Sequence, residues 1–192
     1  MGGDPVRPVP LVVGANQRSS SLFVRDRLYV ADGARSGFLA DLKAAGIDQA
    51  VLVSTCDRIE VQAVHGQPEE AARRIEALMA RHAGLAREEI EGELYVMTGE
   101  AALRHIFCVA ASLDSTVIGE AHVLAQVKES HRASRAAGLT GSALEAVVKT
   151  ITHDRIENRD GPATWFVGTS IVQMSEADRS QLLSYLERRS GE

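Results

Sequence analysis

The sequence is poor in several residue types on which particular kinds of protein depend. Aromatic residues make up only 4% of the 192 residues, so a platform of rings that stacks single-stranded bases is not expected. The two cysteines, Cys56 and Cys108, are too few for a disulfide framework. No CxxC spacing indicates zinc, so we expect no bound metal.

Long apolar runs and an excess of positive charge are also missing. No apolar run reaches the roughly 20 residues that span a bilayer, and residues 1–10 lack a signal-peptide pattern. We therefore expect a cytoplasmic protein with no membrane partner. The net charge of −5 opposes indiscriminate nucleic-acid binding, although it is compatible with a local basic patch. The 45% of hydrophobic residues is typical of a globular chain.

Strand-like and helix-like patterns alternate in the first half of the chain. The patterns predict strands at 11–15, 49–54, 59–64 and 93–97, and helices at 21–45, interrupted near Asp32-Gly33, and at 68–84. This order is the βαββαβ pattern of a ferredoxin-like antiparallel sheet. The predicted fold class is therefore α+β, with additional helices towards the C-terminus.

The second half of the chain is predicted to be mainly helical. Helices are expected over 99–112, 119–137 and 142–158, followed by a β-prone stretch at 164–172 and a short terminal helix around Leu182, Leu183 and Leu186. We accordingly expect a flexible leader over residues 1–10, a folded domain over 11–160 and a C-terminal extension over 161–192.

One segment, Ser54-Thr55-Cys56-Asp57-Arg58, places a thiol in a tight connection between two predicted strands. A nearby guanidinium favours the thiolate, which is the nucleophilic form of cysteine. Taken alone, these five residues are more typical of a buried cysteine beside a surface arginine.

Two other features admit both a structural and a functional interpretation. His105 in a predicted apolar helix is by itself more often a core residue, but with a reactive thiol it makes a Cys–His arrangement. Asp114, Ser115 and Glu120 crowd into a mostly apolar segment, where helix capping explains them equally well. Cys108 lies in an apolar helix and is predicted to be a core residue.

Four motifs, taken together, resemble the N-terminal catalytic domain of glutamyl-tRNA reductase. The family's GINHxTAP corresponds to GANQRSSS at 14–21, its RE-rich helix start to RDR at 25–27, and its STCNR followed by xE to STCDRIE at 54–60. Its HLFxVAxGLDSxVxGExQILxQVK corresponds to HIFCVAASLDSTVIGEAHVLAQVK, from His105 to Lys128. The resemblance covers roughly residues 11–150 and implies the same ferredoxin-like fold.

The resemblance also implies roles for individual residues. Cys56 would attack the ester carbonyl of an aminoacyl-tRNA, and His105 would be the second catalytic residue. Arg58 would hold the charged part of the amino acid. The substrate-binding residues that the resemblance implies are Asn16, Thr55, Arg58, Ser115, Glu120 and His122.

Some positions depart from the family pattern. Gln17 replaces its histidine, Asp57 replaces the asparagine after the nucleophile, and His122 replaces a glutamine. Asp57 adds a negative charge beside the thiol and should oppose thiolate formation.

The chain contains no GxGxxG after a strand and no βαβ run after residue 160, so we expect no cofactor to bind it. We therefore expect a thioester on Cys56 to be hydrolysed or passed to a small-molecule acceptor, rather than reduced by a separate NADPH-binding protein. The main alternative is an inactive module that binds tRNA or regulates tetrapyrrole synthesis. A third alternative is a truncated reductase, which the different ending of the chain opposes.

Overall fold

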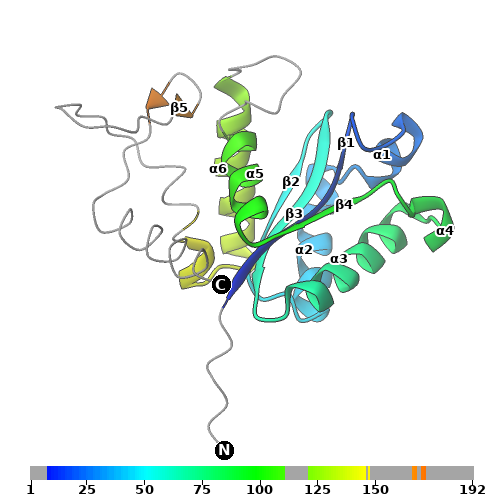
Figure 1. Cartoon of the computed structure of the whole chain (residues 1–192), viewed down its shortest axis with the longest axis horizontal. Helices are drawn as coiled ribbons and strands as arrows, with labels where there is room; N and C mark the ends of the chain where they lie inside the picture. Colours follow the sequence, from blue (N-terminus) through cyan, green and yellow to red (C-terminus); the bar gives the residue numbers. More distant parts are fainter. Residues whose placement is uncertain (1–7, 111–120, 146, 148–165, 168–169, 172–192) are drawn as a thin grey trace, which may run out of the picture.

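The structure, a computed structural model, describes residues 8–110, 121–145, 147, 166–167 and 170–171 (Figure 1). In these residues, no helix is both long enough and apolar enough to cross a membrane. The predicted helix over 142–158 begins as expected, with residues 142–145 helical, and its continuation beyond residue 147 lies outside the described residues.

A four-stranded sheet forms the centre of the molecule. Its strands are β1 (Val9–Asn16), β2 (Ala50–Ser54), β3 (Arg58–His65) and β4 (Tyr95–Thr98). The order across the sheet is β2-β3-β1-β4, and each neighbouring pair is antiparallel. The predicted mixture of helices with an antiparallel four-stranded sheet is therefore confirmed.

Helices cover both faces of this sheet (Figure 1). On one face lie α1 (Leu22–Leu28), α2 (Asp32–Ala44), α3 (Pro68–Ala83) and α4 (Arg87–Ile90), and on the other lie α5 (Gly99–Ala110) and α6 (Ala121–Ala136). Two short strands, β5 (Phe166–Val167) and β6 (Ser170–Ile171), pair with each other. They fall inside the stretch that the sequence marks as β-prone.

The boundaries of several elements differ from the predicted ones, most clearly in the first helical stretch. The break in the first helical stretch falls at residues 29–31, and Asp32 and Gly33 begin α2 instead of interrupting it. The reason is Val30, which is 1% exposed and whose N–H donates to the Ser54 hydroxyl over 3.0 Å. In addition, β1 begins two residues earlier than predicted, and the four-residue α4 was not predicted.

The strands alternate between two differently composed faces. Ile59, Val61 and Ala63 of β3 belong to the larger apolar core, which packs against the first four helices. The alternate residues Arg58, Glu60 and Gln62 are 4%, 0% and 4% exposed. A polar row of β3 is thus buried, and the candidate site is built on it.

Candidate active site

The connection between β2 and β3 carries Cys56. The N–H of Thr55 donates to the carbonyl oxygen of Arg58 over 2.8 Å. The Thr55 hydroxyl accepts from the N–H groups of Asp57 and Arg58, at 3.3 and 3.2 Å. These hydrogen bonds close the turn, as serine and threonine hydroxyls commonly do. Cys56 is exposed on this turn, so the expectation for the segment taken alone, a buried cysteine and a surface Arg58, is wrong on both counts.

Asn16 ends β1 at the same end of the sheet. It lies opposite Arg58 in the pairing of β1 with β3. Its Oδ1 accepts from the N–H groups of Arg18 and Ser19, at 2.9 and 3.1 Å, and its own N–H donates to the Ser19 hydroxyl over 3.0 Å. Asn16 therefore shapes the loop from β1 to α1 and holds it beside the strand that follows Cys56.

His105 reaches the buried carboxylate of Glu60 from α5. The two side chains are 10% and 0% exposed, and Nε2 lies 2.9 Å from Oε1. The helix follows β4 directly because Gly99, at φ 62°, adopts a backbone conformation that favours glycine. This sharp junction lets β4 and α5 contribute side chains to one place.

Glu60 accepts three further hydrogen bonds. Arg58 Nη1 and the Tyr95 hydroxyl donate to Oε1 over 2.8 and 2.5 Å. Gln62 Nε2 donates to Oε2 over 3.0 Å. The Tyr95 and His105 rings also meet edge to face, with centroids 5.4 Å apart. One carboxylate therefore joins side chains from β3, β4 and α5.

The environment of Glu60 keeps this carboxylate ionised. Burial alone would raise its pKa. The hydrogen bond from His105, the charges of His105 and Arg58, and the hydrogen bond from Tyr95 outweigh burial and lower the pKa of Glu60 from 4.5 to about 2. An ionised carboxylate only accepts hydrogen bonds, so His105 donates to it through Nε2.

Gly14 of β1 makes room for the Glu60 side chain. In the sheet it lies between Glu60 on β3 and Tyr95 on β4. A Cβ at this position would come within 2.6 Å of Glu60 Cγ and 2.7 Å of the Ile59 carbonyl oxygen. Only glycine therefore lets the Glu60 side chain cross β1 and meet the Tyr95 hydroxyl.

The structure places five of the predicted site residues at one end of the sheet. Asn16, Thr55, Cys56 and Arg58 lie on β1, β3 and the turn, and His105 joins Arg58 through Glu60. In the described part of the chain, no hydrogen bond joins His105 to Cys56, and Nε2 is directed to Glu60 instead.

Three other predicted site residues lie wholly or partly beyond the description. Ser115 and Glu120 fall outside the described residues. His122 is part of α6, but its side chain is not described. Cys108, predicted to be in the core, is only partly buried on α5.

Sequence reasoning assigned no role to Glu60, Gln62, Tyr95 or Gly14, although the motif segments at 54–60 and 14–21 contain Glu60 and Gly14. The signal for Glu60 and Gln62 was their alternation with apolar residues along β3, which indicated a strand with one polar face. Such a face is usually exposed to water. Here α5 and α6 cover it, and a covered row of polar residues needs internal partners.

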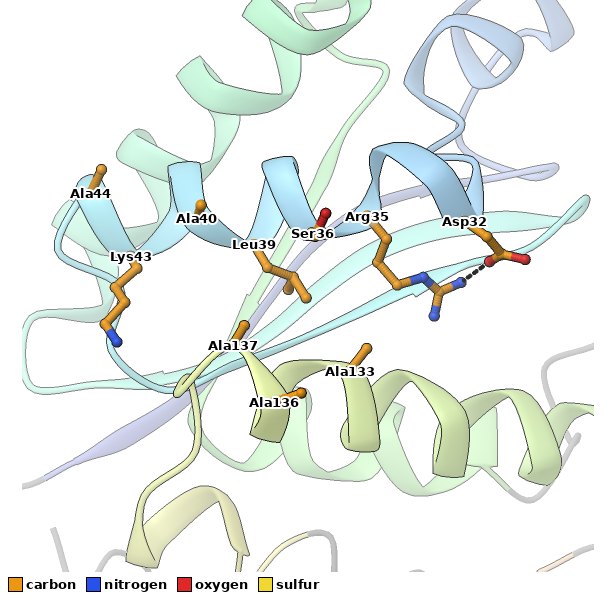
Figure 2. Close-up of a pocket in the computed structure, with 10 residues that line it drawn as sticks. All are labelled: Asp32, Arg35, Ser36, Leu39, Ala40, Lys43, Ala44, Ala133, Ala136 and Ala137. Carbon is orange, nitrogen blue, oxygen red and sulfur yellow. Dashed lines mark hydrogen bonds and ion pairs between the residues drawn. The ribbon is translucent and has the colours of Figure 1, made fainter.

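A separate groove lies between α2 and α6 (Figure 2). Its volume is about 610 Å³. Arg35 and Lys43 extend from α2 toward α6, which contributes Ala133 and Ala136, and Ala137 follows directly after the helix. None of the predicted site residues lines this groove.

Comparison with known sequences assigns the family. The family described as "Glutamyl-tRNAGlu reductase, N-terminal domain" matches residues 13–154. The chain belongs to this family. It is 34% identical over 139 residues to the glutamyl-tRNA reductase of Rhodospirillum rubrum and 37% identical over 143 residues to that of Syntrophus aciditrophicus. Each match covers 72% of this chain, but only 32% and 33% of those relatives, so the chain spans about a third of their length.

A solved structure of a family member has the same fold. The glutamyl-tRNA reductase from Methanopyrus kandleri superposes with a TM-score of 0.58 at 23% identity. The match covers 74% of this chain and 32% of that one. The resemblance deduced from the motifs is therefore confirmed as membership of this family.

Proposed function

We propose that this chain takes an aminoacyl group, in the first instance glutamyl, from charged tRNA as a thioester on Cys56. The sulfur bonds to the ester carbonyl carbon, and the bond from that carbon to the ribose oxygen breaks. The thiol proton ends on the leaving ribose oxygen. The observation that carries the proposal is the exposed Cys56 on a closed turn, in a family whose members are named for glutamyl-tRNA.

The thioester would then be passed to water or to a small-molecule acceptor. Water attack releases the free amino acid and regenerates the thiol, so the cycle is balanced without an electron donor. The 192 residues contain no GxGxxG, the usual phosphate-binding turn of a nicotinamide site, so NADPH should stay unoxidised when incubated with this chain and charged tRNA. We expect this reaction to take place in the cytoplasm.

We also propose that the fold is of the ferredoxin-like class. The strand order β2-β3-β1-β4 supports this assignment.

Substitution of Arg58 tests which aminoacyl group the chain captures. Its guanidinium is buried and one of its N–H groups goes to Glu60, so the side chain is held in place. A fixed guanidinium binds a carboxylate through two parallel hydrogen bonds, which lysine cannot reproduce. Arg58→Lys should therefore slow the capture of glutamyl by about 10-fold or more and that of neutral aminoacyl groups much less.

The experiment measures the deacylation of a panel of charged tRNAs by the wild type and by Arg58→Lys. Arg35→Lys is the matched control, because Arg35 is also largely buried and ion-paired, to Asp32 at 3.0 Å, but lies in the α2–α6 groove. Equal loss for glutamyl and neutral substrates would remove the selectivity role of Arg58. No deacylation of any substrate by the wild type would refute the function.

Substitution of Asp57 gives a test that separates the active enzyme from the inactive binding module. Its carboxylate follows Cys56 directly in the chain, at the position where the family motif has an uncharged asparagine. Asp57→Asn, which restores the family motif, should speed the alkylation of Cys56 by iodoacetamide at neutral pH about 3-fold. The rate is followed by mass spectrometry across a range of pH.

The control is Asp48→Asn, which removes an exposed carboxylate before β2 rather than after it. If Asp57→Asn and the wild type react alike, Asp57 does not tune the nucleophile. If Cys56 resists alkylation in every variant, the inactive module becomes the better account.

A further inference from the structure

We propose that Glu60 is the positioning residue of His105, and that it holds the imidazole with the proton on Nε2 so that Nδ1 serves proton transfer during acyl transfer. This inference rests on the proposed function for the chemical step, whereas the position of the proton can be tested without it.

The hydrogen bond to Glu60 fixes one edge of the His105 imidazole ring. Nε2 of His105 lies 2.9 Å from Glu60 Oε1, and both side chains are removed from water. Tyr95 packs edge to face against the same ring and donates to the same oxygen. The ring is therefore held at two points, by a hydrogen bond and by a packed aromatic edge.

The charge of Glu60 fixes the proton. A neutral imidazole carries one N–H, on either of its two nitrogens, and the partner at each nitrogen decides which. Glu60 is ionised and buried, so the nitrogen facing it must donate. When the ring is neutral, the other nitrogen, Nδ1, is left as the proton acceptor; when the ring is charged, both nitrogens carry protons and Nε2 still donates to Glu60.

Burial of an ionised carboxylate at this position costs free energy, and several features of the chain offset that cost. Gly14 leaves space for the side chain, and Arg58, Gln62 and Tyr95 satisfy it. A buried ion with its partners is generally no more stabilising than apolar residues of the same volume. An apolar core at this place would therefore be about as stable. The orientation of a catalytic histidine accounts for the buried carboxylate better than stability does.

In the chemical step, Nδ1 takes the proton of the Cys56 thiol as sulfur attacks the ester carbonyl. It returns that proton to the ribose oxygen as the carbon–oxygen bond breaks. Charge and protons balance without a further reactant. The carboxylate of Glu60 does not itself change its protonation state; it stabilises the imidazolium that forms and keeps the ring oriented, as the buried carboxylate of a catalytic triad does.

The first test is the tautomer of His105 in the intact chain. Long-range ¹H–¹⁵N correlation spectra of protein labelled at histidine should show the proton on Nε2 at a pH where the ring is neutral. The signal is assigned by its loss in His105→Gln. A proton on Nδ1 in the wild type would overturn the inference whatever the protein's activity, and this reading needs no variant of Glu60.

The second test is kinetic. Glu60→Gln should slow the acylation of Cys56 by glutamyl-tRNA about 100-fold, at the lower end of the usual effect of an acid–base group. In a His105→Ala background most of this effect should disappear, because Glu60 acts mainly through His105. The small part that remains reflects Arg58, which Glu60 also holds in place. A purely structural role would instead slow both backgrounds by the same factor and would refute the inference.

The chain supplies a matched control in a second histidine–glutamate contact. His131 Nε2 lies 3.1 Å from Glu145 Oε1, and both side chains are partly buried. Glu145→Gln should leave the acylation of Cys56 unchanged while altering the His131 signals. If the wild type shows the Nε2 proton but never forms the thioester, the proposed function fails while the positioning of His105 stands.

Discussion

Replacement of Cys56 by serine should reduce the deacylation of glutamyl-tRNA by about 10³-fold or more, because a neutral serine hydroxyl is a far weaker nucleophile than a thiolate. The substitution is close in size and lies on an exposed turn, so the fold should be unaffected. The thioester should be absent, and any adduct that forms should be a slowly formed ester. The measurement is single-turnover deacylation of glutamyl-tRNA labelled in the amino acid.

Cys108→Ser is the matched control, since it removes the other thiol of the chain. Cys108 lies on α5 and is partly buried. This variant should keep the wild-type rate of deacylation. A rate that falls with Cys108→Ser and survives Cys56→Ser would place the nucleophile on the helix and contradict the assignment.

The stability of the wild type should fall steeply in acid because of Glu60. Its pKa is about 2 when folded and close to 4.5 otherwise. A carboxyl group with a lowered folded pKa contributes stability above its unfolded pKa and loses it as the pH falls through the folded pKa. Between pH 5 and pH 2 this group should therefore remove about 3 kcal/mol from the free energy of unfolding.

Urea unfolding of the wild type and Glu60→Gln at a series of pH values measures this contribution. The variant cannot lose a charge at this position, so the difference in free energy of unfolding between the two proteins should shrink as the pH falls from 5 to 2. Glu70→Gln is a comparison at an exposed, ion-paired carboxylate, whose contribution should be small. A constant difference between the wild type and Glu60→Gln would show that Glu60 is not a lowered-pKa carboxylate.

The sequence predicts the turn that holds Cys56 because the evidence for it is local. An apolar run and an alternating strand flank the five residues from Ser54 to Arg58, and the hydroxyl of Thr55 can close the turn within three positions. Glycine and proline signals likewise predict the start and end of α3, where Pro68 begins the helix and Gly84 follows it at φ 63°. Features of this kind depend on neighbours in the chain, so a single sequence reveals them.

A single sequence does not reveal the buried network around Glu60, because the residues that form it are distant from one another in the chain. Tyr95 and His105 meet Glu60 from 35 and 45 residues away. The alternation along β3 shows that its two faces differ, but not that α5 will cover the polar one. The break between α1 and α2 was misplaced for a related reason, since Val30 is buried by tertiary packing rather than by helical periodicity.

The central claim is that Cys56 carries the aminoacyl group, and one measurement tests it directly. The wild-type chain is incubated with glutamyl-tRNA, stopped in acid, digested and examined by mass spectrometry. We expect an adduct of glutamyl mass on the peptide that contains Cys56, and hydroxylamine should remove it. The same adduct on the Cys108 peptide, or no adduct on a Cys56 that iodoacetamide readily alkylates, would contradict it.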